Sequence, residues 1–148
     1  MILCSGEALI DMLPRETGQG ERAFAPYAGG AVFNTAIALG RLDVPTGFFS
    51  GLSSDLFGDI LTEALSASNV DSSLAARSAR PTTLAFVTLT NGQASYVFYD
   101  ENSAGRMVTP DDLPGLSPDV SALYFGGISL ACEPGANAYA ALLAQEGI

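Results

Sequence analysis

Short apolar runs alternate with segments of helical periodicity along most of the chain, and this alternation limits the fold more than any other feature. The runs typical of buried strands are residues 2–5, 46–52, 70–74 and 122–125. Apolar side chains recur at helical spacing over residues 31–42, 57–68 and 136–145. Such alternation predicts a parallel sheet covered by helices, so the expected fold class is α/β.

Two stretches interrupt this alternation. Residues 14–27 begin with a polar, turn-rich segment and become strand-like, and residues 82–100 hold two strand-like runs around Asn91-Gly92. An Asn-Gly pair between such runs predicts a β-hairpin. We expect these stretches to form an extra sheet that stands away from the main one.

The sequence ends soon after the third expected helix. An open α/β sheet with so few strands leaves much apolar surface uncovered. We therefore expect residues 1–148 to be one part of a larger domain.

Charge and composition exclude several classes of function. The formal net charge is −10, and the six basic residues are all arginines that form no cluster. Nucleic acids and anionic membrane surfaces are therefore not expected partners. Because the chain has no histidine, we expect no Cys/His zinc site or other metal site, and no histidine-based catalytic triad.

The cysteines and the N-terminus have simple interpretations. Cys4 and Cys132 lie in apolar, strand-like runs, so we expect both to be buried small side chains. The first residues lack the basic start and apolar core of a signal peptide, and no apolar run could span a bilayer. A cytoplasmic location is the default expectation.

A glycine pair before the first expected helix is the strongest candidate for a binding element. Gly29 and Gly30 allow a tight turn and let a ligand approach the backbone amides. Asn34 follows one helical turn later and offers amide donors and an acceptor. The combination suits a hydroxyl-rich ligand, although a plain connecting loop would look the same. It matches neither nucleotide-binding glycine fingerprint.

Asp11 is the second candidate. It lies just past the carboxyl end of the first expected strand, where α/β sheets bind ligands, and it is flanked by Ile10 and Met12. A carboxylate among apolar residues needs hydrogen-bond partners, which sugar hydroxyls would supply. The alternative is a solvated carboxylate, or one that caps backbone amides.

An aromatic strand at residues 96–99 leads into an acidic pair. Tyr99, at the end of this strand, could cover a sugar ring, whereas packing is the simpler role for the aromatic residues before it. Arg106 could bind substrate, or it could form an ion pair with Asp100 or Glu101 at the surface.

The order of five blocks resembles the ribokinase-like (PfkB-type) carbohydrate kinases, and the bacterial fructokinase branch most closely. The blocks are GEALIDMLP, AGGAVFNTAIALGRL, FFSGLSSDLFG, YDENSAGRM and YFGGISL, and the resemblance covers essentially all 148 residues. It implies the N-terminal half of a three-layer α/β/α core. It also implies a small β-sheet lid, built from residues 14–27 and 82–100, that closes over the sugar. In many members of the family two such lids clasp to form a homodimer.

The resemblance assigns roles to the candidate residues. Asp11 and Asn34 match positions that bind sugar hydroxyls, and Gly29 and Gly30 match positions that give backbone amides and clearance. Tyr99 and Arg106 lie near the lid and the sugar.

One departure from the family pattern bears on the substrate. Asp100 stands where many relatives, including kinases of acidic sugars, have arginine. An acidic pair at Asp100-Glu101 would repel a sugar carboxylate, so we expect a neutral sugar, with fructose first.

The resemblance also implies ATP and Mg²⁺ as cofactors, bound mainly by a C-terminal half. The family's catalytic base is an aspartate in a G-A-G-D segment, which deprotonates the sugar hydroxyl that attacks the γ-phosphate. No such segment occurs in this sequence, so we expect no catalytic residue here and no activity from this chain alone. The alternatives are a non-catalytic sugar-binding or lid-mediated interaction module, or a ribose, keto-deoxy-gluconate or nucleoside kinase of the same family.

Overall fold

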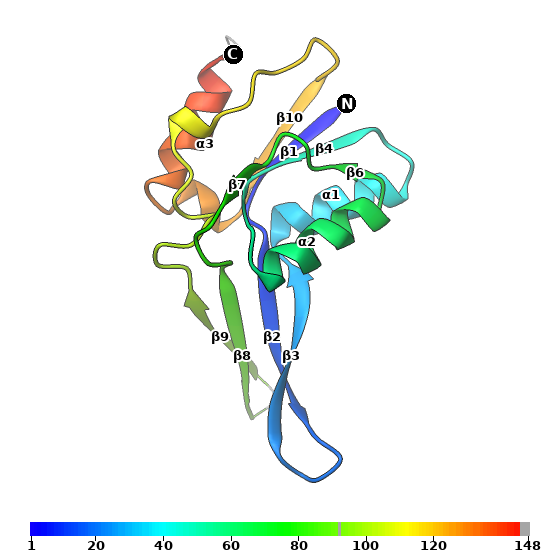
Figure 1. Cartoon of the computed structure of the whole chain (residues 1–148), viewed down its shortest axis with the longest axis vertical. Helices are drawn as coiled ribbons and strands as arrows, with labels where there is room; N and C mark the ends of the chain where they lie inside the picture. The colour runs from blue at the N-terminus through cyan, green and yellow to red at the C-terminus, as the bar shows by residue number, and fades with distance from the viewer. Residues whose placement is uncertain (92, 146–148) are drawn as a thin grey trace.

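A parallel sheet forms the centre of the computed structural model, which describes residues 1–91 and 93–145. Its four strands run in the order β10 (Ala122–Gly126), β1 (Ile2–Gly6), β4 (Thr46–Phe49) and β6 (Val70–Asp71) (Figure 1). All neighbouring pairs are parallel. The predicted parallel sheet is therefore confirmed.

Two helices cover one face of this sheet. α1 (Ala31–Arg41) and α2 (Leu56–Ala67) pack against Cys4 of β1 and Phe48 of β4. The rings of Phe33 and Phe48 meet edge to face, with their centroids 5.8 Å apart. Burial raises the pKa of the Cys4 thiol to about 11, so the thiol stays protonated at neutral pH and Cys4 is the buried small side chain that was predicted.

A third helix covers the opposite face. Successive strand residues point to opposite sides, so Leu3 and Phe49 face away from α1 and α2. They pack instead on α3 (Gly135–Gln145), where the ring of Tyr139 lies edge to face with Phe49 at a centroid distance of 5.9 Å. The predicted three-layer α/β/α arrangement is confirmed.

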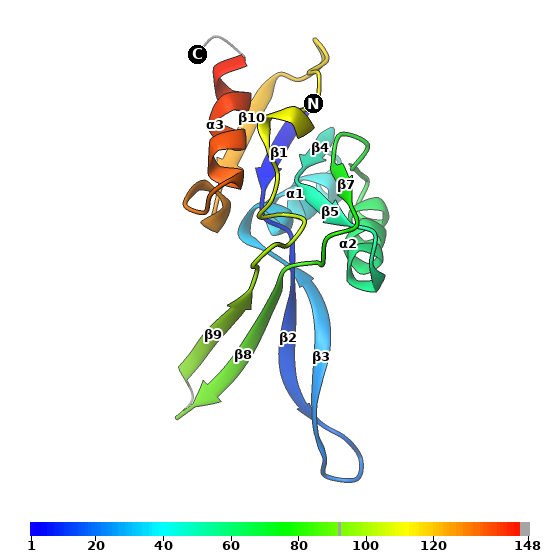
Figure 2. The ribbon, with the colours of Figure 1, turned by 60° about the vertical axis from the view of Figure 1, so that its left-hand side comes forward.

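A second, mixed sheet projects away from the layered core (Figures 1 and 2). It runs in the order β3 (Arg22–Gly29), β2 (Leu9–Glu16), β8 (Leu84–Thr90) and β9 (Gln93–Tyr99). The β2–β3 and β8–β9 pairs are antiparallel, and the central β2–β8 pair is parallel. We call these four strands the projecting sheet.

Asp55 joins the projecting sheet to the core. Its Oδ1 accepts hydrogen bonds from the first amides of α2, at 3.1 Å from Phe57 and 2.8 Å from Gly58, and both carboxylate oxygens accept from Thr82, just before β8. Burial alone would raise the pKa of Asp55, but hydrogen bonds from Thr82, Gly58 and Ser53 outweigh it and hold the pKa below its ordinary value. The carboxylate form is therefore the one that the fold stabilises.

The remaining elements are short. β5 (Gly51–Ser53) and β7 (Ala76–Ser78) form a parallel pair. Single 3₁₀ turns lie at Pro110–Asp112 and Ile128–Leu130. None of the helices that the structure describes is long and apolar enough to cross a membrane.

The structure also differs from the sequence-based expectations. The run at residues 46–52 breaks at Ser50 into β4 and β5, and β7 was not predicted. β2 continues to Glu16, into the segment expected to be a turn.

Cys132 lies on a bend before α3 and is only partly buried, so the prediction of a buried strand cysteine is wrong there. Of the expected Asn91-Gly92 turn, Gly92 lies outside the described residues.

Candidate functional site

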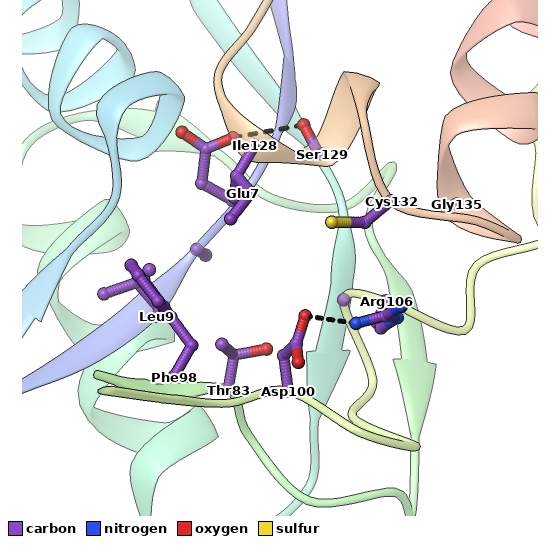
Figure 3. Close-up of a pocket in the computed structure, with 12 residues that line it drawn as sticks. Glu7, Leu9, Thr83, Phe98, Asp100, Arg106, Ile128, Ser129, Cys132 and Gly135 are labelled. Carbon is purple, nitrogen blue, oxygen red and sulfur yellow. Dashed lines mark hydrogen bonds and ion pairs between the residues drawn. The ribbon is translucent and has the colours of Figure 1, made fainter. Parts of the chain in front are cut away.

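A pocket lies where the projecting sheet meets the layered core (Figure 3). It holds about 460 Å³ of empty space, part of it open to solvent. Segments distant in sequence line it: Glu7 after β1, Thr83 before β8, Asp100 after β9, and Ser129 and Cys132 between β10 and α3. The pocket therefore sits at the carboxyl end of the central strand β1, where open α/β sheets bind ligands.

Asp11, Gly29, Gly30 and Asn34 are not among the residues that line this pocket. Asp11 lies on β2, two residues after the lining residue Leu9, and its carboxylate sits against the backbone of Gly29 on β3. The carboxylate occupies the space that a side chain at residue 29 would need, because a Cβ there would overlap Oδ2 of Asp11. Leu9, which is paired with Gly29 in the β2–β3 ladder, also lines the pocket. Gly29 thus provides clearance for the Asp11 carboxylate, and its predicted clearance for a sugar stays a prediction.

The Asp11 carboxylate has no hydrogen-bond donor among residues 1–91 and 93–145. It is partly buried, and burial raises its pKa above the ordinary aspartate value. An acceptor that is partly desolvated and unpaired can still accept hydrogen bonds from a ligand.

The bend after Gly29 sets the direction of α1. Gly30 has φ of +112°, and a Cβ there would lie 2.8 Å from the carbonyl oxygen of Glu7. The Asn34 amide nitrogen donates to the Gly30 carbonyl at 2.8 Å, so Asn34 belongs to the first turn of the helix that this bend starts. The Asn34 side chain is exposed, and no hydrogen bond joins it to Asp11 in the described part of the chain.

Arg106 lines the pocket but is already paired. Its Nη1 lies 2.8 Å from Oδ2 of Asp100 (Figure 3). Its Nε donates to the Glu133 carbonyl at 3.3 Å. The predicted surface ion pair of Arg106 with Asp100 is confirmed. The arginine bridges the end of β9 and the segment before α3, and its charge is balanced within the protein.

The register of the projecting sheet separates Tyr99 from Asp11. Asp11 lies opposite Ala85, and Ala85 lies opposite Phe98, so Asp11 and Phe98 share one face of the sheet. Tyr99 is the next residue and points to the other face, where its ring packs edge to face on Phe86 with a centroid distance of 5.5 Å. Phe98, which also lines the pocket, is the aromatic residue on the side of Asp11.

The sequence analysis missed Glu7 and Ser129. The Ser129 hydroxyl donates to Oε2 of Glu7 at 3.1 Å, and the carboxylate also accepts the first amides of α1 (Figure 3). Glu7 follows Gly6 inside a block that was singled out, and a charge immediately after a buried strand was a signal that could have identified it.

The comparisons with known proteins agree with this architecture. The sequence profile of the pfkB family of carbohydrate kinases matches residues 1–146. The chain belongs to this family.

Among its curated relatives, the chain is 63% identical over 146 residues to a fructokinase of Rhizobium leguminosarum bv. trifolii, covering 99% of this chain and 45% of that protein. The structure of a fructokinase with bound ATP from Xylella fastidiosa superimposes with a TM-score of 0.84 at 34% identity, over 93% of this chain and 45% of that one. A Vibrio cholerae O395 fructokinase in a form that binds fructose, ADP and calcium ion gives a TM-score of 0.78 at 26% identity, over 97% and 46% of the two chains. The chain therefore spans somewhat less than half the length of these PfkB relatives.

The residues described here do not fit a nucleoside triphosphate or its metal ion. The N-termini of helices bind phosphate through free backbone amides, but acidic side chains occupy these positions on α1, α2 and α3, namely Glu7, Asp55 and Glu133. No group of acidic residues and cysteines in the described ranges could hold a metal ion.

The close approach of Asp11 to Gly29 can be tested by adding a methyl group. In Gly29→Ala the new Cβ overlaps Oδ2 at the free end of the Asp11 side chain, which must turn aside, so we expect the free energy of unfolding to fall by about 0.5–1.5 kcal/mol, the cost of a side chain forced off its preferred rotamer. Gly115→Ala is the matched control, because nothing lies within 4 Å of a Cβ at that position. Denaturant unfolding of both variants measures the difference, and equal stabilities would contradict the contact.

Proposed function

We propose that this chain is the sugar-binding half of an ATP-dependent fructokinase, which transfers a phosphoryl group to a hydroxyl of fructose. The Asp11 carboxylate carries the proposal, because it is partly buried, set against a glycine bend, and without a hydrogen-bond donor among residues 1–91 and 93–145. The fructokinase relatives support the substrate class.

In the proposed complex, Asp11 accepts hydrogen bonds from sugar hydroxyls and Asn34 adds an amide donor and acceptor from the first turn of α1. Gly29 and Gly30 form the bend between these two residues, and we propose that their backbone contributes to the site. The Phe98 ring, on the same sheet face as Asp11, offers an apolar surface to the carbon skeleton of the sugar. We propose Asp11, Gly29, Gly30 and Asn34 as the core of the site. Phe98 takes the role suggested for Tyr99 from the sequence, which is to cover the sugar ring.

The ion pair at the pocket supports a neutral sugar. Asp100 neutralises Arg106, and Glu101 is exposed next to it. An acidic sugar would need an unpaired cation, and Arg106 would have to leave Asp100 to provide one. Arg106 therefore acts as a wall of the pocket, and fructose is favoured over keto-deoxy-gluconate.

Catalysis is proposed to depend on residues outside this chain. ATP and Mg²⁺ supply and activate the phosphoryl group in this reaction class, and the residues here do not fit either of them. This chain's contribution is to bind the sugar and orient its hydroxyl, and we propose that it is inactive alone.

The role of Asp11 can be measured directly. In the protein expressed from its complete reading frame, we expect Asp11→Ala to lose about 1.5–3 kcal/mol of transition-state stabilisation, the worth of a hydrogen bond to a charged group, or roughly ten- to a hundredfold in kcat/KM for fructose. Asn34→Ala should lose less, because its partners are neutral. Asp71→Asn, an exposed carboxylate at the far edge of the parallel sheet, is the control. Unchanged kinetics for Asp11→Ala would remove Asp11 from the site.

The same residue should set a pH dependence. The ionised carboxylate is the form that accepts hydroxyl hydrogen bonds, and burial raises the pKa of Asp11. The value of kcat/KM should therefore fall on acidification at a pH above the ordinary aspartate pKa of about 3.9. A raised pKa means that folding favours the protonated form, so its stabilising contribution is present at low pH and lost as the pH rises. Asp11→Asn should thus lose activity at pH 7 without losing stability.

We also propose that two copies clasp through the projecting sheet, which would then act as a lid. Large apolar side chains are exposed on one of its faces, namely Leu89 at 65%, Tyr96 at 55% and Phe98 at 43%. Exposed apolar patches of this kind mark interaction surfaces. Sedimentation analysis should show a dimer that Leu89→Glu converts to monomers, and a monomeric parent protein would contradict the clasp.

A further inference from the structure

One carboxylate, that of Glu7, is bound by two other segments of the chain. Its Oε1 accepts hydrogen bonds from the amides of Ala31 at 2.9 Å and Val32 at 3.3 Å, the first two residues of α1. Its Oε2 accepts from the Ser129 hydroxyl at 3.1 Å, in the turn that follows β10 (Figure 3). Glu7 itself lies between β1 and β2. A single side chain thus joins the end of the central strand, the start of α1 and the wall of the pocket.

The backbone of two neighbouring segments packs closely around Glu7. Gly127 has φ of +74°, and a Cβ there would overlap the Glu7 carboxylate. On the other side, the Phe33 amide donates to the Glu7 carbonyl at 3.3 Å. Both the side chain and the main chain of Glu7 therefore hold the first turn of α1.

This attachment fixes the geometry of the proposed sugar site. The bend at Gly30 has no side-chain cap of its own, so the orphan amides of α1 depend on Glu7. A negative charge at this end also interacts favourably with the helix dipole. Because Asn34 lies in the first turn, any shift of the helix start moves Asn34 relative to Asp11.

We propose that Glu7 is a positioning residue for sugar binding: it locks the first turn of α1 so that Asn34 and the Gly29-Gly30 bend stay in register with Asp11. The proposal rests on the proposed function. Glu7 acts through α1 and not by contact with the sugar, and this distinguishes it from Asp11.

The test uses steady-state kinetics of the protein from its complete reading frame. We expect Glu7→Ala to raise KM for fructose roughly tenfold or more, since misplacement by about 1 Å is enough for such losses, while KM for ATP stays the same. Glu7→Gln keeps the length of the side chain and one acceptor oxygen, so its KM for fructose should rise only about threefold.

Asp112→Ala is the control. Asp112 accepts hydrogen bonds from the amide and the hydroxyl of Thr109, at 2.8 and 2.9 Å, in the Pro110–Asp112 turn, and it does not line the pocket. We expect Asp112→Ala to lower the melting temperature and to leave KM for fructose unchanged. A general loss of stability is thereby separated from loss of positioning.

A double-mutant cycle tests whether Glu7 acts through α1. If it does, the effects of Glu7→Ala and Asn34→Ala on kcat/KM should be less than additive. Additive effects would contradict the proposal, as would an unchanged KM for fructose in folded Glu7→Ala. Should Glu7→Ala fail to fold, Glu7→Gln decides, and an unchanged KM would overturn the proposal. A parent protein that neither binds nor phosphorylates fructose would refute the proposed function itself, which is a separate result.

Discussion

The bend between β3 and α1 is the constraint on which the rest of the site depends. Gly29 lets the Asp11 carboxylate sit against the backbone, and Gly30 takes a φ that other residues rarely adopt. The bend turns the chain from the projecting sheet into the first helix of the core. Asp11 lies against this bend and Asn34 follows it in the first turn of α1, so the connection between the two parts of the fold positions both residues.

Acidic side chains already occupy the helix N-termini and the arginine of the pocket in this chain. Glu7, Asp55 and Glu133 each accept amides at the start of a helix, which stabilises the helices and removes their phosphate-binding capacity. Asp100 similarly occupies Arg106. Asp11, by contrast, is a carboxylate that accepts no hydrogen bond from residues 1–91 or 93–145. This set of groups is the basis for our proposal that the ligand is an uncharged polyol.

Much of the architecture could be predicted from the sequence because the spacing of apolar residues indicates which side chains are buried. The helix that starts after Gly30 and the parallel strands around Cys4 follow from patterns that have one interpretation. β7 was missed because Ala76–Ser78 is too short to show a period. The side of the sheet on which Tyr99 lies could not be predicted. Residues 96–99 are all apolar, so no alternation of polar and apolar residues shows which of them share a face with Asp11. The roles of Glu7 and Ser129 depend on contacts between residues 122 positions apart, which no local pattern encodes.

A crystal structure of the complete protein with fructose tests the central claim most directly. We predict that sugar hydroxyl oxygens lie within hydrogen-bonding distance, about 2.5–3.0 Å, of the Asp11 carboxylate, and that at least one lies within reach of the Asn34 amide. Fructose bound elsewhere, or bound with the Asp11 carboxylate still unpaired, would contradict the claim that the glycine bend builds a sugar site.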